Sequence, residues 1–305
     1  LLRCVIKERS VMKNSVKNYV ALFVGVAALS TSAIFVKLSE APSSITALYR
    51  LLFTALTLLP FLIFSKKNRI ELKSLTEKQY FYIILSGFFL AVHYVMWFES
   101  LRFTSVASST VLVALQPVFS IVFGFILLKE KISKSSAIGC LTAVLGSVSI
   151  GWGDFRISGA ALVGDFLALA AAGVISLYFL VGQVVRSSVG TVTYSVVGYI
   201  SSVVFLLIYS FIKNDSLTGY SSGTWLALIG LALISTIGGQ FIFNMLLNKL
   251  SASAVTVSIL GEPIGTCIFA YFILNETVSL RQLLGMAIIL FGISVFFCSP
   301  KNKNV

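Results

Sequence analysis

Ten apolar runs, each about as long as a bilayer is thick, constrain the fold of this chain more than any other feature of its sequence. A helix needs about 20 apolar residues to cross the hydrocarbon core of a bilayer, so each run predicts one membrane-spanning helix. Short connectors that carry most of the charged residues separate the runs. The sequence therefore predicts an all-α polytopic membrane protein with ten transmembrane helices, at residues 19–38, 43–64, 80–99, 106–128, 134–151, 160–182, 190–212, 222–246, 252–274 and 280–298.

The composition supports this class and excludes a soluble nucleic-acid-binding domain. Of the 305 residues, 57% are hydrophobic and only 11% are charged, whereas soluble domains carry about 25% charged residues. The formal net charge of +12 would suggest a nucleic-acid partner if it were clustered on a soluble domain. The basic residues lie instead in connectors between apolar runs, which is the positive-inside pattern of membrane proteins. The expected partner is the lipid bilayer, and no nucleic acid is expected.

The basic residues also predict the orientation of the chain. With the N-terminus inside, the cytoplasmic connectors and ends hold 17 Lys and Arg residues, and the outer connectors hold four. Such an excess of Lys and Arg marks the cytoplasmic loops of membrane proteins. We therefore expect a multi-pass protein of a bacterial-type cytoplasmic cell membrane, with the N-terminus and the C-terminus both inside.

Two short motifs in the middle of apolar runs indicate an internal repeat. Gln116 and Pro117 in ALQPVF stand 146 residues before Glu262 and Pro263 in LGEPIG. The same offset pairs the fourth predicted span with the ninth and the fifth with the tenth, so each half holds five spans. Because five is odd, the halves must cross the membrane in opposite directions, which is the inverted repeat of many transporters.

The repeat divides the chain into four predicted parts around a central cavity. They are a cytoplasmic N-terminal segment, a first five-helix repeat, a second five-helix repeat and a cytoplasmic tail, at residues 1–18, 19–151, 160–298 and 299–305. LLRCVIKERSV precedes Met12, and we expect Met12 to be the natural start and residues 1–11 not to be native. The chain after Met12 is similar to a signal sequence without a clear cleavage site, so we expect a retained first helix.

Glu262 is the first candidate functional residue, because it lies in the middle of an apolar run. A carboxylate at the centre of a membrane helix costs about 2.5 to 3.5 kcal/mol on insertion scales, so such residues usually serve a function. Pro117 and Pro263 lack an N–H and open their helices locally, which exposes backbone carbonyls to a binding site. The alternatives are two tolerated kinks and a protonated Glu262 bonded to a neighbouring helix. Gln116 is the neutral counterpart of Glu262.

Polar and aromatic residues within other spans are further candidates for lining the cavity. His93 and Trp97 are four residues apart on one helix face, with Tyr94 adjacent, and could bind a solute by stacking and hydrogen bonding. Gln240 and Asn244 are likewise four apart. Packing of His93 and an interfacial Trp97 fit the sequence equally well, and for Gln240 and Asn244 amides that join helices are the slightly favoured interpretation. The remaining candidate in this group is Tyr178.

Charged and small residues suggest structural roles. Arg50 lies about 10 Å along the second span, given a rise of about 1.5 Å per residue. Glu40 and Glu99 lie at the same predicted membrane face as possible partners, and we expect an ion pair of Arg50 with Glu99 near an outer gate. Glycines seven residues apart predict close helix packing and leave open whether the protein is a monomer or a homodimer. These glycines are Gly139, Gly146, Gly285 and Gly292.

The sequence provides little material for catalysis or for a cofactor. The four cysteines have no metal-ligand spacing, the chain has one histidine, and no hydrolase or nucleotide-binding motif is present. We therefore expect no enzyme activity, no cofactor and no metal. A membrane-embedded enzyme or a receptor is the alternative of a different class. An enzyme would need polar residues at catalytic spacing, and a receptor would need a sizeable loop or soluble domain.

Eight segments of the chain carry a resemblance to a known family: STSAIFVKL, APSSITALYR, HYVMWFESLRFTSVASSTV, LQPVF, LLKEKIS, GDFLALAAAGVISLYFLVGQ, ILGEPIG and LNETVS. Through them the chain, from about residue 19 onward, resembles the EamA-like family of the drug/metabolite transporter superfamily. It implies ten helices in two inverted halves and a cavity lined mainly by helices 1, 3, 4, 6, 8 and 9. It also implies export of small metabolites such as amino acids.

The predicted function is therefore secondary transport of a small organic solute by alternating access. Burial favours the protonated form of the Glu262 carboxyl, so this residue is a candidate for exchanging a proton as the cavity opens to either side. Import, or transport of a drug-like or lipid-like solute, is the alternative within the same class.

Overall fold

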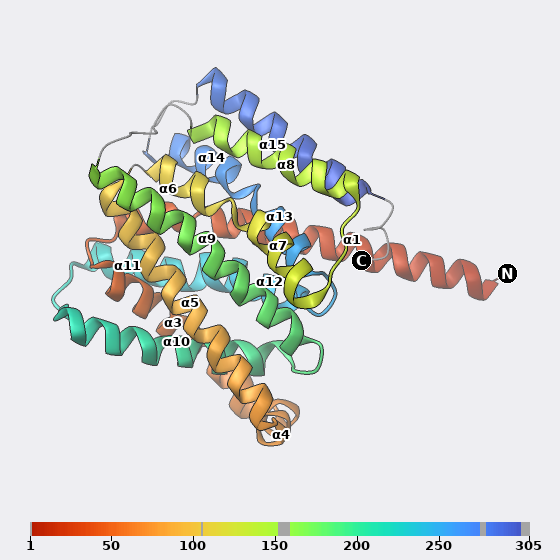
Figure 1. Cartoon of the computed structure of the whole chain (residues 1–305). Helices are drawn as coiled ribbons and strands as arrows, with labels where there is room; N and C mark the ends of the chain where they lie inside the picture. The colour runs from red at the N-terminus through yellow and green to blue at the C-terminus, as the bar shows by residue number, and fades with distance from the viewer. Residues whose placement is uncertain (1, 105, 152–158, 275–278, 300–305) are drawn as a thin grey trace.

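The computed structural model describes residues 2–104, 106–151, 159–274 and 279–299, and its regular structure there is entirely helical (Figure 1). The helices run over α1 Leu2–Ser30, α2 Ser32–Leu38, α3 Ser43–Phe64, α4 Lys66–Ser74, α5 Glu77–Phe103, α6 Val106–Val113, α7 Gln116–Leu128, α8 Lys134–Gly151, α9 Gly159–Arg186, α10 Thr191–Lys213, α11 Ser222–Gly230, η1 Leu231–Phe241, α12 Ile242–Leu246, α13 Ala252–Ile259, α14 Glu262–Leu274 and α15 Leu280–Cys298.

Within the described ranges, nine helical segments are long and apolar enough to cross a membrane. They coincide with nine of the predicted spans, and the prediction of an all-α, multi-pass membrane protein is confirmed. The remaining predicted span, 134–151, coincides with α8. The nine segments are Val16–Leu38, Ser43–Phe64, Glu77–Phe103, Ser109–Leu128, Ala161–Arg186, Thr191–Lys213, Ser222–Leu246, Ala252–Ile273 and Leu280–Cys298.

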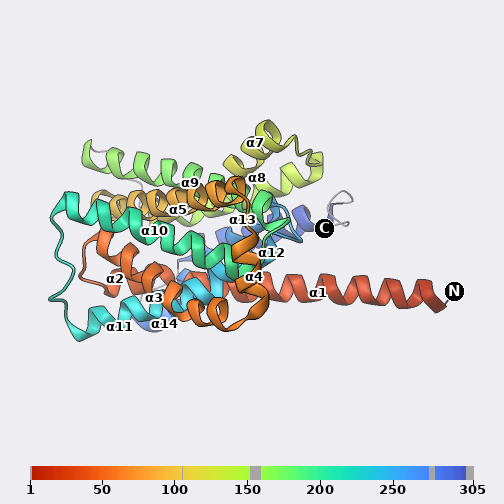
Figure 2. The same ribbon diagram turned by 90° about the horizontal axis from the view of Figure 1, so that it is seen from below.

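Helices α8 and α15 pack directly against each other and lie side by side along one face of the bundle (Figure 1). Their glycines explain the close approach. A Cβ atom at Gly139 would overlap the carbonyl of Gly292, and one at Gly146 would overlap the carbonyl of Gly285. The predicted glycine stripes of α8 and α15 therefore face each other and form a helix contact within a single chain. In the view of Figure 2, the start of α1 extends beyond the rest of the bundle.

Three of the membrane-spanning segments are interrupted. A turn at Thr31 separates α1 from α2, one at residues 114–115 separates α6 from α7, and one at residues 260–261 separates α13 from α14. Pro117 and Pro263 are the second residues of the helices that follow the last two breaks. Proline suits this position because the first turn of a helix needs no donor to a preceding carbonyl. The breaks place Gln116 and Glu262 at helix starts.

The segment between α11 and α12 is an 11-residue π-helix, η1, which the hydropathy pattern did not predict. The hydroxyl of Thr236 donates to the carbonyl of Leu231, five residues earlier, at 2.8 Å. Because a π-helix adds residues to each turn, it changes which side chains of the segment face the interior. Gln240 lies near the end of η1, so this local geometry sets its direction.

Candidate functional site

A cavity of about 30 Å³ lies where the two proline-linked breaks approach α1, α3, α5, α9 and η1. This volume has room for one or two water molecules, so the cavity is nearly closed. Six of the eight predicted cavity residues line it, namely His93, Tyr94, Trp97, Gln116, Gln240 and Glu262. Pro263 and Arg50 line it as well, whereas Pro117 does not.

Tyr178 and Asn244 are brought together outside this cavity. The hydroxyl of Tyr178 donates to Oδ1 of Asn244 at 2.8 Å, and both side chains are buried. The amide nitrogen of Asn244 donates in turn to Ser195 at 3.2 Å and to Tyr199 at 3.3 Å. The two residues therefore belong to a polar cluster among α9, α10 and α12, and they do not contact the cavity.

Arg50 is fully buried and takes different partners from those expected. Its Nε donates to Thr236 at 2.8 Å and its Nη1 to Ser32 at 2.7 Å. The guanidinium also lies over the ring of Tyr94, with its central carbon 4.5 Å from the ring centroid. The third nitrogen, Nη2, has no hydrogen-bond partner. Arg50 therefore joins α2, α3 and η1 and directs one free donor at the cavity wall.

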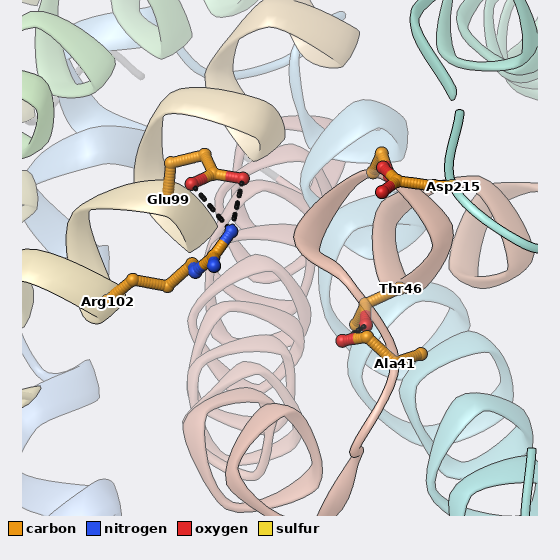
Figure 3. Close-up of polar contacts among 6 residues, drawn as sticks. Ala41, Thr46, Glu99, Arg102 and Asp215 are labelled. Carbon is orange, nitrogen blue, oxygen red and sulfur yellow. Dashed lines mark hydrogen bonds and ion pairs between the residues drawn. The ribbon is translucent and has the colours of Figure 1, made fainter. Parts of the chain in front are cut away.

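The expected ion pair between Arg50 and Glu99 does not form. Among the described residues, the one ion pair within 4 Å joins Glu99 to Arg102, at 3.4 Å (Figure 3). The two residues are three apart on α5 and so lie on the same helix face. Arg50 lies deeper, one helical turn beyond Thr46, and finds hydroxyl partners there. The three-residue spacing of Glu99 and Arg102 predicts the observed ion pair better than the shared membrane face of Glu99 and Arg50 did.

Three further buried polar atoms that line the cavity have no partner. They are Nε1 of Trp97, Nε2 of Gln240 and Oγ1 of Thr110. A buried donor without an acceptor costs about 1–3 kcal/mol, so such groups seldom persist without a ligand or water to bind. The cavity is therefore rich in unsatisfied donors. Sequence reasoning missed Thr110, although its position six residues before Gln116 places it close to the same break.

His93 supports the aromatic wall of the cavity. Its Nδ1 lies 3.0 Å from the carbonyl oxygen of Ala171 on α9. Because a carbonyl only accepts, Nδ1 carries the proton, and in the neutral ring the other nitrogen is an acceptor. The imidazole also stacks on Trp97, with ring centroids 5.8 Å apart and planes inclined by 25°. His93 thus fixes the indole while lining the cavity itself.

Glu262 and Gln116 are each tied to the opposite half of the chain through their backbone carbonyls. The hydroxyl of Ser30 on α1 donates to the carbonyl of Glu262 at 3.1 Å, and that of Ser176 on α9 donates to the carbonyl of Gln116 at 2.7 Å. Glu262 lines the same cavity as the buried Arg50, and among the described residues no ion pair within 4 Å joins the two.

A larger vestibule of about 490 Å³ lies one helical turn from the cavity, at the end of the bundle where α2 meets α3. Thr46 lines the vestibule and Arg50 the cavity, four residues further along α3. Arg102 stands on one wall and Asp215 on the other (Figure 3). The hydroxyl of Thr46 bonds the carbonyl of Ala41 at 3.3 Å and shapes the rim. A solute reaching the cavity from this end would first enter the vestibule.

Hydrogen bonds close the opposite end of the bundle. The side chain of Gln183 on α9 donates to Glu130 after α7 and accepts from the backbone N–H of Ala252 at the start of α13. Arg186 donates to the carbonyl of Asn244 at 2.9 Å and to Thr191 at 2.6 Å. These contacts join α9 to segments of both halves. They cross-link the end of the bundle that lies opposite the vestibule.

Comparison with known proteins gives a consistent family and fold. The sequence model of the EamA-like transporter family matches the chain twice, over residues 17–152 and 162–298. An "Uncharacterized transporter" of Clostridium kluyveri is 24% identical over 263 residues, 83% of each chain. "Uncharacterized transporter YetK" of Bacillus subtilis is 25% identical over 304 residues, 96% of this chain and 90% of YetK. A solved crystal structure, 16% identical, has a TM-score of 0.74 over 92% of this chain and 96% of the other, so the two share a fold.

Proposed function

Because the chain belongs to the EamA-like transporter family, we propose that it is a secondary transporter that exports a small organic metabolite, such as an amino acid, by alternating access. One observation carries the proposal. A nearly closed cavity with unpaired donors and a carboxyl lies at the breaks of two interrupted helices. Interrupted helices meeting at mid-membrane are the usual binding site of secondary transporters.

The proposed architecture is an inverted repeat of residues 19–151 and 160–298, with both chain ends in the cytoplasm. The contacts of α8 and α15 support it. Gly139 meets Gly292, and the 146-residue offset converts this pair into Gly285 and Gly146, which also meet. Two helices that cross with such exchanged contacts are related by a two-fold axis perpendicular to both. An axis of this kind inverts one half relative to the other, and the inversion supplies two similar end states.

In the proposed cycle the present form is closed to the cytoplasm and open outward as far as the vestibule. Opening the Gln183 contacts would admit solute from the cytoplasm, and the return movement would release it through the vestibule. The cavity must expand, because about 30 Å³ does not hold an amino acid. Glu262 is the proposed proton-coupling residue, since its carboxyl lies in the cavity within the field of Arg50.

Transport in proteoliposomes tests the function. Proteoliposomes that contain the purified protein would be loaded with a pool of radiolabelled amino acids. Efflux of the label would be followed with and without an imposed pH gradient. We expect efflux of at least one amino acid above that from empty liposomes, and its loss in Trp97→Ala. Retained folding of the variant, measured by thermal unfolding, is the control. Efflux equal to that of protein-free liposomes for every compound, together with unchanged metabolite levels in cells that lack the protein, would contradict the proposal.

A lipid-like or drug-like solute is the second candidate, because of an apolar groove of about 350 Å³ between α1, α14 and α15. Ser30 and Gly261 line the groove, and Gly261 directly precedes Glu262 in the sequence. A solute from the lipid phase could reach the break between α13 and α14 by this route. Competition of long-chain alkyl amines with amino-acid efflux separates the two candidates, since only a groove-fed site would favour the alkyl amine.

A further inference from the structure

We infer that Arg50, Trp97 and Gln240 form a subsite for the carboxylate group of the transported solute. The inference rests on the proposed transport function and names the chemical class of solute, a small organic carboxylate. Its basis is the set of three N–H donors that line one cavity and have no partner, Nη2 of Arg50, Nε1 of Trp97 and Nε2 of Gln240.

The donors are buried too deeply for bulk water to satisfy them. The side chains of Arg50, Trp97 and Gln240 are 0%, 5% and 3% exposed. Each belongs to a different segment, α3, α5 and η1, so no local turn explains their meeting. Buried polar atoms in native proteins nearly always have a partner. Three unpartnered N–H donors, together with Oγ1 of Thr110 at the same cavity, indicate that an acceptor binds there.

The structure also holds the three donors in place without an acceptor. Thr236 and Ser32 engage Nε and Nη1 of Arg50, which leaves Nη2 as the nitrogen that is free to bind. The stacked ring of His93 fixes the indole of Trp97. Gln240 lies near the end of η1, where burial restricts its side chain to 3% exposed. A site prepared in this way loses little conformational entropy when it binds a ligand.

A carboxylate matches these donors better than other small groups. It has two oxygens with about four acceptor positions and can accept from the guanidinium, the indole and the amide together. Its negative charge balances that of Arg50, which lacks a direct ion pair. An amine would bring only donors and a like charge to the same wall, and a neutral amide would offer one oxygen, where a carboxylate offers two, to the three donors. Glu262 remains available for the other end of the solute.

Water is the competing occupant, because the cavity has room for one or two molecules. A water molecule can accept from two donors, and a pair of waters would relieve all three without any solute. Water would serve neutral and anionic solutes alike, whereas a carboxylate subsite must distinguish them. A preference for an acid over the neutral amide of the same shape therefore distinguishes a carboxylate subsite from a site that holds only water.

The experiment compares acids with amides of the same shape in nanodisc-embedded protein. The probes are acetate and acetamide, 4-methylpentanoate and its amide, and 3-phenylpropanoate and its amide, with binding measured by calorimetry and by thermal stabilisation. We expect at least one acid to bind tenfold or more tightly than its amide. Trp97→Phe, which keeps an aromatic ring beside His93 and replaces the indole with a smaller ring that has no N–H, should weaken that acid about fivefold or more. Arg50→Lys should reduce the preference for the acid over the amide.

Arg102→Gln is the matched control, since Arg102 is an arginine of the vestibule and does not line the cavity. It should leave the preference for the acid unchanged. The subsite is wrong if no acid of the panel binds more tightly than its amide, or if Trp97→Phe binds the acid as the parent does. Transport of a solute without a carboxylate would overturn the subsite and leave the proposed function standing. Tight binding of acids without any transport would support the subsite and contradict the proposed transport function.

Discussion

Ser30 and Ser176, 146 residues apart, make the same two hydrogen bonds in opposite halves of the chain. The hydroxyl of Ser30 shares its one proton between the carbonyls of Val26, at 2.8 Å, and Glu262, at 3.1 Å. That of Ser176 donates to the carbonyls of Ala172, at 2.8 Å, and Gln116, at 2.7 Å. The acceptors are also separated by 146 residues. Each hydroxyl thus ties its own helix to the helix break of the other half.

We expect Ser30→Ala and Ser176→Ala to destabilise the protein by similar amounts. Each change leaves a carbonyl at a helix break without its donor, and a net hydrogen bond is worth about 0.5–1.5 kcal/mol. Thermal unfolding in detergent measures the effect. Ser294→Ala is the matched control, because its hydroxyl bonds only the carbonyl of Leu290 on its own exposed turn. Two serine variants as stable as this control would contradict the prediction.

The elements that could be predicted from the sequence are those set by local pattern. Apolar runs of bilayer length predicted the spans, because hydropathy alone governs insertion. Two prolines with matching neighbours indicated the breaks that now flank the cavity. The spacing of His93 and Trp97 placed them on one face, where the structure stacks them. Each of these signals can be read from one segment of the sequence, without knowing which helices pack together.

The parts that could not be predicted depend on which distant helices meet. The partners of Arg50 are Ser32 and Thr236, and neither is visible from the sequence around Arg50. The π-helix η1 has no compositional signal, and Asn244, in the helix α12 that follows it, bonds Tyr178 outside the cavity. Helix faces in a membrane bundle are chosen by packing, which a hydropathy pattern does not contain.

The glycine contacts of α8 and α15 predict a sharp intolerance to side chains. We expect Gly139→Ala to destabilise the protein by about 1–3 kcal/mol, the usual cost of overpacking a close contact. The added Cβ would overlap the main chain of Phe296 and Gly292, which cannot move aside as a side chain could. Gly159→Ala is the control, because among the described residues no atom outside its own helix and chain neighbours lies within 4 Å of the Cβ it would add. Equal unfolding temperatures for the two variants would show that α8 and α15 separate readily.

The proposed inverted repeat predicts that equivalent positions label from opposite sides of the membrane. Lys134 and Leu280 are 146 residues apart, and both are exposed at the starts of α8 and α15. Cysteines introduced there, after replacement of the four natural cysteines by serine, should react with an impermeant maleimide from the cytoplasmic side and the outer side respectively. Labelling of both cysteines from one side would contradict the inverted arrangement.

Removing the titration of Glu262 should uncouple transport from the pH gradient. Glu262→Gln keeps the shape of the side chain and matches the Gln116 that stands in the other half. We expect efflux driven by a pH gradient to fall about tenfold or more, while exchange of labelled for unlabelled solute continues. Proteoliposome assays at several pH values measure both. A variant that responds to the gradient as the parent does would assign Glu262 a structural role.

Gln183 should hold the proposed cytoplasmic end closed. Its amide bonds Glu130 and the first N–H of α13 at once, so Gln183→Leu removes two contacts between segments of different halves. The closed state would lose about 1–3 kcal/mol, since a net hydrogen bond contributes about 0.5–1.5 kcal/mol. A shift of this size changes the ratio of open to closed molecules by roughly 5-fold to 150-fold.

Access to the cavity reports this shift. Thr110 lines the cavity, and a cysteine in its place should react faster with a thiol reagent added to inside-out vesicles when Gln183→Leu is also present. Gln79→Leu is the matched control, because Gln79 bonds Ser188 at the same end but on the exposed surface, at 3.0 Å. If both leucine variants leave the labelling rate unchanged, the Gln183 contacts do not form the gate, and the seal lies with the Arg186 contacts to Asn244 and Thr191.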